Sequence, residues 1–252
     1  MIRIKGLTVS REGDMILRDV SMEIITGEKI LLIGANGSGK TSLARVLMGD
    51  PLYTVISGSI DVVKNPGSTE KVTDLLSLDV HERARRGLFV SFQVPVELPG
   101  VSAYEFLHAA YRSLHEKDAH IKDIDDLAAD IDKLAKTLAI SPAILHRGVN
   151  EGFSGGERKK LELLQMLILK PRYVILDEPD SGMDVDAVRK IAEVVEVLDP
   201  EVGVLLISHD AQRIGIKKFD RIFIMEKGHI GRVGGMELVE EVARKGYETH
   251  AA

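Results

Sequence analysis

The chain has 252 residues, of which 44% are hydrophobic, so it can bury a substantial core as one large domain or as a domain with a subdomain. Its 33 basic and 39 acidic residues give a formal charge of −6, which argues against a nucleic-acid-binding protein. The absence of cysteine excludes disulfides and any thiolate metal or cluster site built from this chain alone. Its apolar runs are far shorter than a membrane span requires and its start shows no signal sequence, so we expect a cytoplasmic protein without direct membrane insertion.

The first part of the chain reads as β-rich. Alternation over residues 2–5 and apolar runs at 15–17, 20–24 and 30–33 predict strands. A helix is expected over residues 42–48. It is followed by a strand at 58–63, a helix at 80–86 that Gly87 ends, and a short buried strand at 88–92.

The pattern changes at Gln93. Residues 102–146 are rich in helix-forming residues and contain no convincing strand. Ser102 and Glu105 have the spacing of a capping box, and residues 125–138 place their apolar side chains on one helical face. We therefore predict a Q-loop and helical subdomain over residues 93–150, inserted into a core made of residues 1–92 and 151–252.

Strands and helices alternate again from residue 153. Helices are expected at 157–170, 187–198 and 236–245, and strands at 173–176, 204–207 and 221–225. This alternation predicts a mostly parallel sheet covered by helices on both faces. The expected fold class is α/β, with this sheet, an N-terminal antiparallel β region and the inserted all-helical subdomain.

A glycine-rich turn at residues 34–41 separates the apolar run 30–33 from the helix that begins near Ser42. Its spacing, G-x-x-x-x-G-K-[ST], is that of a P-loop, although the bare pattern is also compatible with a glycine turn and an accidental lysine. In a P-loop the glycines allow the backbone N–H groups to surround a phosphate, and the following helix adds its positive dipole end. The predicted ATP-binding residues are Gly34, Asn36, Gly37, Ser38, Gly39, Lys40, Thr41 and Ser42.

Two adjacent carboxylates follow the buried run 173–176. Asp177 and Glu178 stand at the carboxyl end of a predicted parallel strand, where α/β sheets bind ligands, although such a pair can also simply cap a strand. Beside a P-loop, Asp177 can hold Mg²⁺ together with the Thr41 hydroxyl, and Glu178 can orient or deprotonate the attacking water. His209 directly follows the strand at 204–207, which places it at the same edge.

A second anion-binding pattern precedes the helix at 157–170. Ser154-Gly155-Gly156-Glu157 can be an ordinary capped helix start, or a phosphate site made of backbone N–H groups. The P-loop already supplies one phosphate-binding helix for ATP. We therefore expect the second to serve the nucleotide of another copy of the chain.

Six motifs occur in the order and rough spacing of an ABC-type ATPase. They are residues 34–41, Gln93, residues 153–157, residues 173–178, residues 181–184 and His209. They resemble, in this order, Walker A, the Q-loop glutamine, the ABC signature, Walker B, the D-loop that ends at Asp184, and the switch histidine. The resemblance covers essentially the whole chain.

This resemblance implies ATP hydrolysis with Mg²⁺ by a transient, ATP-dependent homodimer. Each ATP would lie between one P-loop and the signature of the other copy, with Ser154 and Gly156 contacting its γ-phosphate in trans. Glu178, His209 and Gln93 would be catalytic, and Thr41, Gln93 and Asp177 would hold Mg²⁺. Many relatives stack adenine on an aromatic residue, but residues 9–16 contain none, so aliphatic side chains such as Val9 or Ile16 would have to serve.

Finer features resemble SufC-type ATPases of the SUF iron–sulfur cluster assembly system. The matching segments are residues 92–102, 150–160, 164–166 and 180–187 and the pair Gly246-Tyr247. The family usually has an aromatic residue at the position of Val94, which is a minor departure. The resemblance implies a SufB- or SufD-like scaffold as the partner, docked after the Q-loop, and the scaffold would supply the cluster ligands that this cysteine-free chain lacks.

Two other functions share parts of this pattern. The nucleotide-binding subunit of a membrane transporter has the same catalytic motifs and differs in the docking surface around residues 93–115. A module that senses ATP without hydrolysing it is disfavoured, because Glu178 and His209 are both present.

Overall fold

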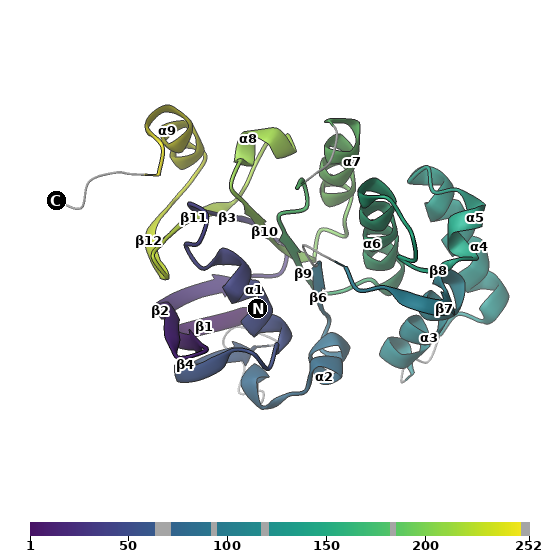
Figure 1. Cartoon of the computed structure of the whole chain (residues 1–252), viewed down its shortest axis with the longest axis horizontal. Coiled ribbons are helices and arrows are strands. Elements are labelled where there is room, and N and C mark those ends of the chain that lie inside the picture. The colour runs from purple at the N-terminus through teal and green to yellow at the C-terminus, as the bar shows by residue number, and fades with distance from the viewer. Residues whose placement is uncertain (64–71, 92–94, 117–120, 182–184, 248–252) are drawn as a thin grey trace.

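A computed structural model describes residues 1–63, 72–91, 95–116, 121–181 and 185–247. Its N-terminal part is a four-stranded antiparallel sheet in the order β2-β1-β4-β5 (Figure 1). The strands are β1 (Ile2–Arg11), β2 (Asp14–Ile24), β4 (Thr54–Val62) and β5 (Thr73–Asp74). The predicted antiparallel β region is thus confirmed, and its first two strands are longer than the local alternation indicated.

The central sheet has six strands in the order β12-β11-β3-β10-β9-β6. They are β3 (Lys29–Ile33), β6 (Leu88–Ser91), β9 (Tyr173–Asp177), β10 (Gly203–Ser208), β11 (Arg221–Glu226) and β12 (His229–Gly234). The strands β11, β3, β10, β9 and β6 pair with their neighbours in parallel. In this sheet only the edge strand β12 is antiparallel, and it forms a hairpin with β11. The carboxyl ends of β3, β9 and β10 therefore meet at one edge.

Alternating side chains of the central strands divide the core into two clusters. Ile30 and Leu32 of β3 join the cluster that the N-terminal sheet and helix α1 (Lys40–Met48) cover, whereas Leu31 and Ile33 join the opposite one. Strands buried on both faces read as continuous apolar runs, which is why the sequence marked them clearly.

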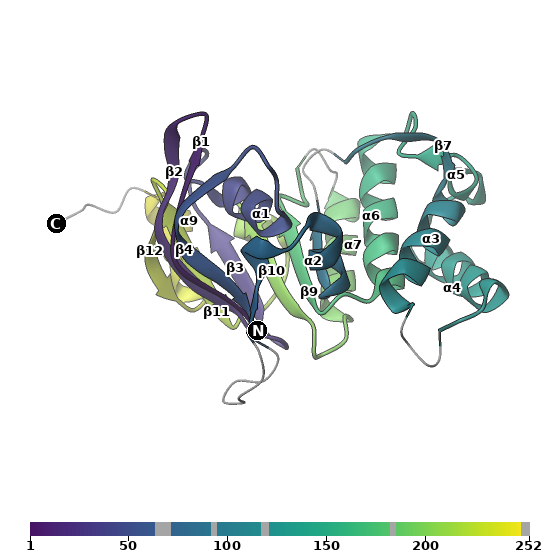
Figure 2. The ribbon, with the colours of Figure 1, turned by 90° about the horizontal axis from the view of Figure 1, so that it is seen from below.

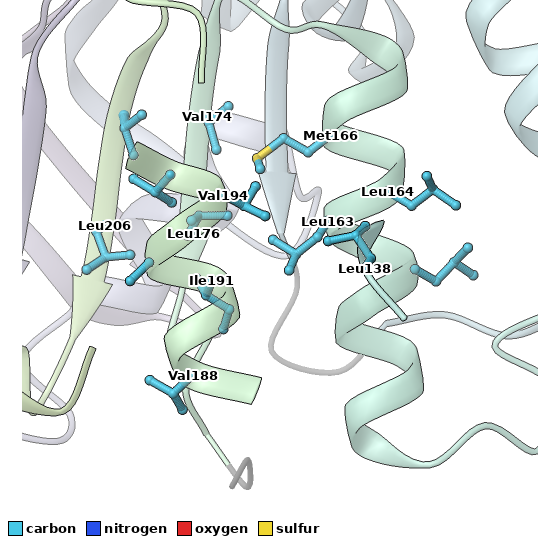
Figure 3. Packing of buried hydrophobic residues seen from close by; sticks show 14 of the residues in the cluster. Leu138, Leu163, Leu164, Met166, Val174, Leu176, Val188, Ile191, Val194 and Leu206 are labelled. Carbon is cyan, nitrogen blue, oxygen red and sulfur yellow. The ribbon is translucent and has the colours of Figure 1, made fainter. Parts of the chain in front are cut away.

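Helices α6 (Gly155–Leu169) and α7 (Val185–Glu196) cover the second face (Figure 3). Met166 of α6 points toward Val174 of β9, and Leu163 of α6 and Ile191 of α7 belong to the same cluster. Because α6 begins with the Ser-Gly-Gly segment, this packing fixes the segment relative to β9 and its carboxylates.

The region between β6 and α6 is mainly helical. It contains α3 (Ala103–His115), α4 (Ile124–Thr137) and α5 (Pro142–Leu145), and α3 begins at the expected capping box, where Ser102 Oγ accepts a bond from the Glu105 N–H. Two short strands, β7 (Leu98–Ser102) and β8 (Gly148–Val149), pair where this region leaves and rejoins the core. Both views place α3 and α4 beside α6 (Figure 2), and one continuous cluster joins them to the sheet, so the domain division stays a prediction.

The remaining helices are short. They are α2 (Val80–Arg85), which follows a 3-10 turn at Leu75–Ser77, α8 (Ala211–Ile214) and α9 (Glu237–Lys245). In the part of the chain that the structure describes, no helix has the length and apolar character needed to cross a membrane.

Candidate nucleotide site

Residues 34–39 connect β3 to α1 at the carboxyl edge of the central sheet, and Lys40 and Thr41 begin the helix (Figure 1). Gly39 stands at the N-cap of α1 with φ +108°, a backbone conformation that favours glycine. No side chain described by the structure caps this helix. The N–H groups of its first turn therefore remain available to an anion, and the helix dipole adds to their attraction.

The loop is tightly enclosed at its start and open at its tip. A Cβ at Gly34 would lie 2.3 Å from the Met225 carbonyl oxygen, so only glycine fits there. Asn36 and Gly37 are exposed at the tip, and Ser42 is half-buried in the first turn of α1. The Ser38 hydroxyl is buried and has no hydrogen-bond partner among the described atoms, which fits a place for a phosphate oxygen.

The Lys40 side chain folds back over this loop. Its ammonium donates to the carbonyl oxygens of Gly34, at 2.7 Å, and Ala35, at 3.0 Å, and the residue is only 4% exposed. Burial lowers the pKa of Lys40, while the nearby Glu178 and Asp177 carboxylates oppose this change. A buried cation surrounded by loop backbone is arranged to receive a strongly anionic ligand.

Thr41 and Asp177 bring the P-loop and β9 together. The Thr41 hydroxyl donates to Asp177 Oδ1 across 3.2 Å. The pKa of Asp177 is raised from 3.8 to about 6, mainly by burial and also by the Glu178 charge, while the Thr41 bond opposes the rise. A bound cation would favour the ionised carboxylate, so this hydroxyl and carboxylate pair, made of oxygen ligands only, fits Mg²⁺. In the described residues no group of three or more His, Cys, Asp or Glu side chains could hold a metal by itself, so phosphate and water would complete the coordination.

Glu178 and His209 follow the ends of the neighbouring strands β9 and β10. His209 Nδ1 lies 3.7 Å from Glu178 Oε1, with the carboxylate side chain 14% exposed and the imidazole 41% exposed. Glu178 has φ +45°, an uncommon conformation for a residue with a Cβ, and its backbone N–H donates to the Ile207 carbonyl. The two side chains that the sequence placed at this edge are thus close enough to act on one water molecule.

Asp180 is a site residue that the sequence analysis gave no role. It is fully buried, neither carboxylate oxygen has a hydrogen-bond partner in the described structure, and burial raises its pKa while the charges of His209 and Arg213 oppose this. Its position two residues after Glu178 was the only available signal. A buried carboxyl without a partner is costly when ionised, which is the cause of the raised pKa of Asp180 near Glu178 and His209.

The Ser-Gly-Gly segment forms the capped start of α6. The Glu157 carboxylate accepts from the Ser154 N–H and from its hydroxyl, each at 2.8 Å, and these bonds lower the pKa of Glu157. A Cβ at Gly155 or at Gly156 would meet no atom within 4 Å, so this surface is open to a partner. Both views place α6 well apart from α1 (Figures 1 and 2), so the P-loop and the Ser-Gly-Gly segment of one chain do not form one site.

Two long-range contacts tie the segment after Gln93 to the start of α6. Asn150 Nδ2 donates to the Val96 carbonyl at 2.8 Å, and Arg158 pairs with Glu97 at 2.6 Å. Movement of residues 96–97 would therefore be transmitted directly to the Ser-Gly-Gly segment. Gln93 and Asp184 lie outside the described residues, so their predicted roles stay predictions.

The two aliphatic residues suggested as adenine contacts differ in burial. Val9 is fully buried in the core and cannot reach a base, which overturns that suggestion. The half-buried Ile16 remains, and its carbonyl oxygen lies 3.4 Å from where a Gly39 Cβ would stand.

Comparison with known sequences identifies a matching family and relatives of this chain. The family model described as ABC transporter matches residues 17–181. A probable ATP-dependent transporter of Synechocystis sp. is 41% identical, with 98% of this chain and 94% of that protein aligned. The iron–sulfur cluster assembly protein SufC of Plasmodium falciparum is 39% identical, over 98% of this chain and 70% of that protein.

Solved structures share the fold. An ATP-binding cassette determined as a dimer in a post-hydrolysis state with ADP and Pi superposes with a TM-score of 0.74, at 20% identity, over 94% of this chain and 99% of that one. At that level of identity the likeness establishes the fold alone. Its coverage extends the match beyond residue 181 to the strands and helices that follow β9.

Proposed function

Because this chain belongs to the ABC transporter family of ATP-binding cassettes and is an ATPase, we propose that it is the ATP-hydrolysing subunit of an iron–sulfur cluster assembly complex. Its dimerisation on ATP would drive a conformational change in a SufB- or SufD-like scaffold. The observation that carries this proposal is the similarity to the Plasmodium SufC over nearly the whole chain. The cysteine-free composition is compatible with it, because the cluster ligands would then belong to the scaffold.

We propose the following roles at the nucleotide. The backbone of residues 34–41 and the first turn of α1 would surround the phosphates, and Lys40 would exchange its loop carbonyls for phosphate oxygens. Glu178 would orient and deprotonate the attacking water, and His209 would help to hold it. Thr41 and Asp177 would hold Mg²⁺, whose charge offsets that of the phosphates, and Gln93 is expected to complete this set.

The second half of the site would come from another copy. Ser154, Gly155, Gly156 and Glu157 present an open helix start that is remote from the P-loop of their own chain. Two chains paired head to tail would place each helix start against the ATP of the other. Asp184, in the D-loop, would lie at the same dimer interface.

A groove beside the helical region is suited to the scaffold. It encloses about 400 Å³ between α2, the segment after Gln93 and α6, and Val80, Pro95, Val96 and Phe106 contribute to its lining. Val96 is 68% exposed and Val80 is 50% exposed, although both are apolar. An apolar groove with exposed large side chains favours a docked amphipathic helix.

Two residues that line the groove also bond to segments next to the proposed nucleotide site. Arg83 lines it and donates to the Val46 and Leu47 carbonyls at the end of α1, at 2.8 and 2.9 Å. Asn150 lines it too and holds Val96 against the segment before α6. A segment that binds here would therefore press on both the P-loop helix and the helix that serves the other copy.

A basic cavity adjoins this groove and indicates the charge of its occupant. It encloses about 450 Å³ and shares Ala84, Leu88, Phe89 and Leu169 with the groove. Its cationic lining residues are Arg85, Arg86, Lys170 and Arg172, and no acidic side chain is among its described lining residues. In a chain of net charge −6, this local excess favours a scaffold segment that carries acidic residues next to its apolar face.

The test is reconstitution with the scaffold. The chain and a SufB- or SufD-like protein from the same genome are co-expressed, and the complex is purified through the scaffold. We expect Val96→Asp to abolish co-purification and Arg85→Glu with Arg86→Glu to weaken it at least about tenfold, as buried apolar and charged contacts at interfaces do. Binding of a fluorescent ATP analogue verifies that each variant is folded. Scaffold binding that neither variant alters would contradict the groove as its site.

A transporter subunit is the rival function, since the Synechocystis relative is named a probable ATP-dependent transporter. The same groove would then receive a segment of an integral membrane permease. Affinity purification of the tagged chain from detergent extracts distinguishes the two, because recovery of a permease and no scaffold would overturn the iron–sulfur proposal.

A further inference from the structure

The last described residue, Tyr247, returns from α9 to the edge of the central sheet. Its hydroxyl donates to the backbone carbonyl of His209 across 2.7 Å. The ring is half-buried, packs against the core, and lines a cavity of about 240 Å³ together with Ile33 and Val239. Figure 1 shows α9 and α8 on the same side of the sheet, which is consistent with this contact.

The same hydroxyl lies near the backbone of Gly34, the first residue of the P-loop. Burial raises the pKa of Tyr247, and the polar Gly34 backbone opposes this rise.

His209 and Gly34 stand where the β3–β10 ladder ends. Ser208 and Ile33 are the last paired residues, and His209 and Gly34 follow them. Beyond this point the two segments of the chain diverge. The segment after β3 enters the P-loop, and the segment after β10 leads to α8. The Tyr247 hydroxyl bonds the His209 carbonyl just past the final rung, near the Gly34 backbone.

A side chain at position 34 could not hold these two segments together. A Cβ at Gly34 would lie 2.3 Å from the Met225 carbonyl oxygen and 2.7 Å from Ser38 Oγ. A hydroxyl from a distant segment can reach the backbone without occupying that space. The link also fixes the main chain of His209, whose imidazole lies beside Glu178.

We propose that Tyr247 is a positioning residue for ATP hydrolysis, which holds the backbone of His209 in place beside the P-loop. The inference rests on the proposed role of His209. Tyr247 acts through that residue, because a small shift of the His209 backbone moves the imidazole relative to Glu178 and to the γ-phosphate. The C-terminal helix α9 thereby contributes to turnover.

Steady-state ATPase kinetics of Tyr247→Phe test the proposal. The phenyl ring keeps the packing of α9 and only the hydroxyl is removed. We expect kcat to fall about fivefold, within the range that one hydrogen bond contributes, and KM for ATP to stay within about twofold. The matched control is Tyr104→Phe, which removes a hydroxyl bonded to Asp132 in the helical region and should alter neither constant.

A double-mutant cycle with His209→Ala separates positioning from a general structural effect. If Tyr247 acts through His209, adding Tyr247→Phe to His209→Ala causes no further loss, measured as single-turnover hydrolysis of radiolabelled ATP. An additive loss, or an unchanged kcat in Tyr247→Phe while His209→Ala is impaired, overturns this inference alone. An unimpaired His209→Ala would instead overturn the proposed role of His209.

Discussion

The Thr41 hydroxyl donates to Asp177 Oδ1 across 3.2 Å, although 136 residues separate the two in the chain. The contact exists because β3 and β9 flank β10, so their carboxyl ends meet at one edge. One partner belongs to the P-loop helix and the other ends a strand that α6 and α7 cover. The bond therefore joins the two halves of the site to which we assign phosphate binding and water activation.

Asp177 makes folding stability depend on pH in an unusual direction. Its folded pKa, about 6, lies above the ordinary value of 3.8, so the folded state holds its proton where the unfolded state has released it. The free energy of unfolding should therefore fall as pH rises from about 4 to about 6, by up to about 3 kcal/mol.

Urea unfolding of the nucleotide-free chain across this pH range tests the effect. Asp177→Asn, which cannot ionise, should lack this component, so its stability relative to wild type should increase with pH over the same interval. Comparing the two chains removes the contribution of carboxylates that do not interact with Asp177. A stability difference between Asp177→Asn and wild type that does not change with pH would show that folding does not raise the pKa of Asp177.

Replacing Glu178 with Gln should separate ATP binding from hydrolysis. The amide keeps the shape of the side chain but cannot take a proton from water, so we expect kcat to fall about 100-fold or more with ATP affinity little changed. ATP should then trap a dimer, visible by size-exclusion chromatography with light scattering. Glu196→Gln, on the exposed end of α7, is the matched control. Normal turnover in Glu178→Gln would contradict the proposed role of Glu178.

Much of this site could be predicted from the sequence, because its signals are local. The apolar run 30–33, the P-loop spacing and the carboxylates after 173–176 each lie within a few residues, and a parallel sheet necessarily gathers strand ends at one edge. The capping boxes at Ser102 and Ser154 are equally local.

The parts that could not be predicted depend on distant contacts. Strands β7 and β8 pair at only two positions, which is too short for an alternating pattern. The burial of Val9 and Asp180 follows from packing against other elements, and the Tyr247 hydroxyl bonds a backbone carbonyl, which residue identity does not reveal.

Arg83 should stabilise the end of the P-loop helix. Its guanidinium is buried and donates to the carbonyls of Val46, Leu47 and Leu78. Arg83→Met fills similar space but leaves these oxygens without a charged donor, so the free energy of unfolding in urea should drop by about 2–4 kcal/mol. Arg86→Met, at an exposed position in the same region, should cost less than about 0.5 kcal/mol. Equal losses in both variants would contradict this role.

Complementation between two inactive chains tests the shared site. Lys40→Ala disables the P-loop, and Gly156→Asp places a negative charge at the open start of α6, where there is room for the side chain. Each variant alone should be inactive. A mixed dimer contains one site with an intact P-loop from one chain and an intact α6 start from the other.

An equimolar mixture should therefore recover about a quarter of the wild-type rate, since half of the dimers are mixed and each has one intact site of two. The rate should also rise with the square of protein concentration while dimers are scarce. A third chain that carries both substitutions should rescue neither single variant, because its mixed dimers with either single variant contain no intact site. No recovery with the two single variants would mean that each chain completes its own nucleotide site, and recovery with the doubly substituted chain would mean that the rescue does not depend on a shared site.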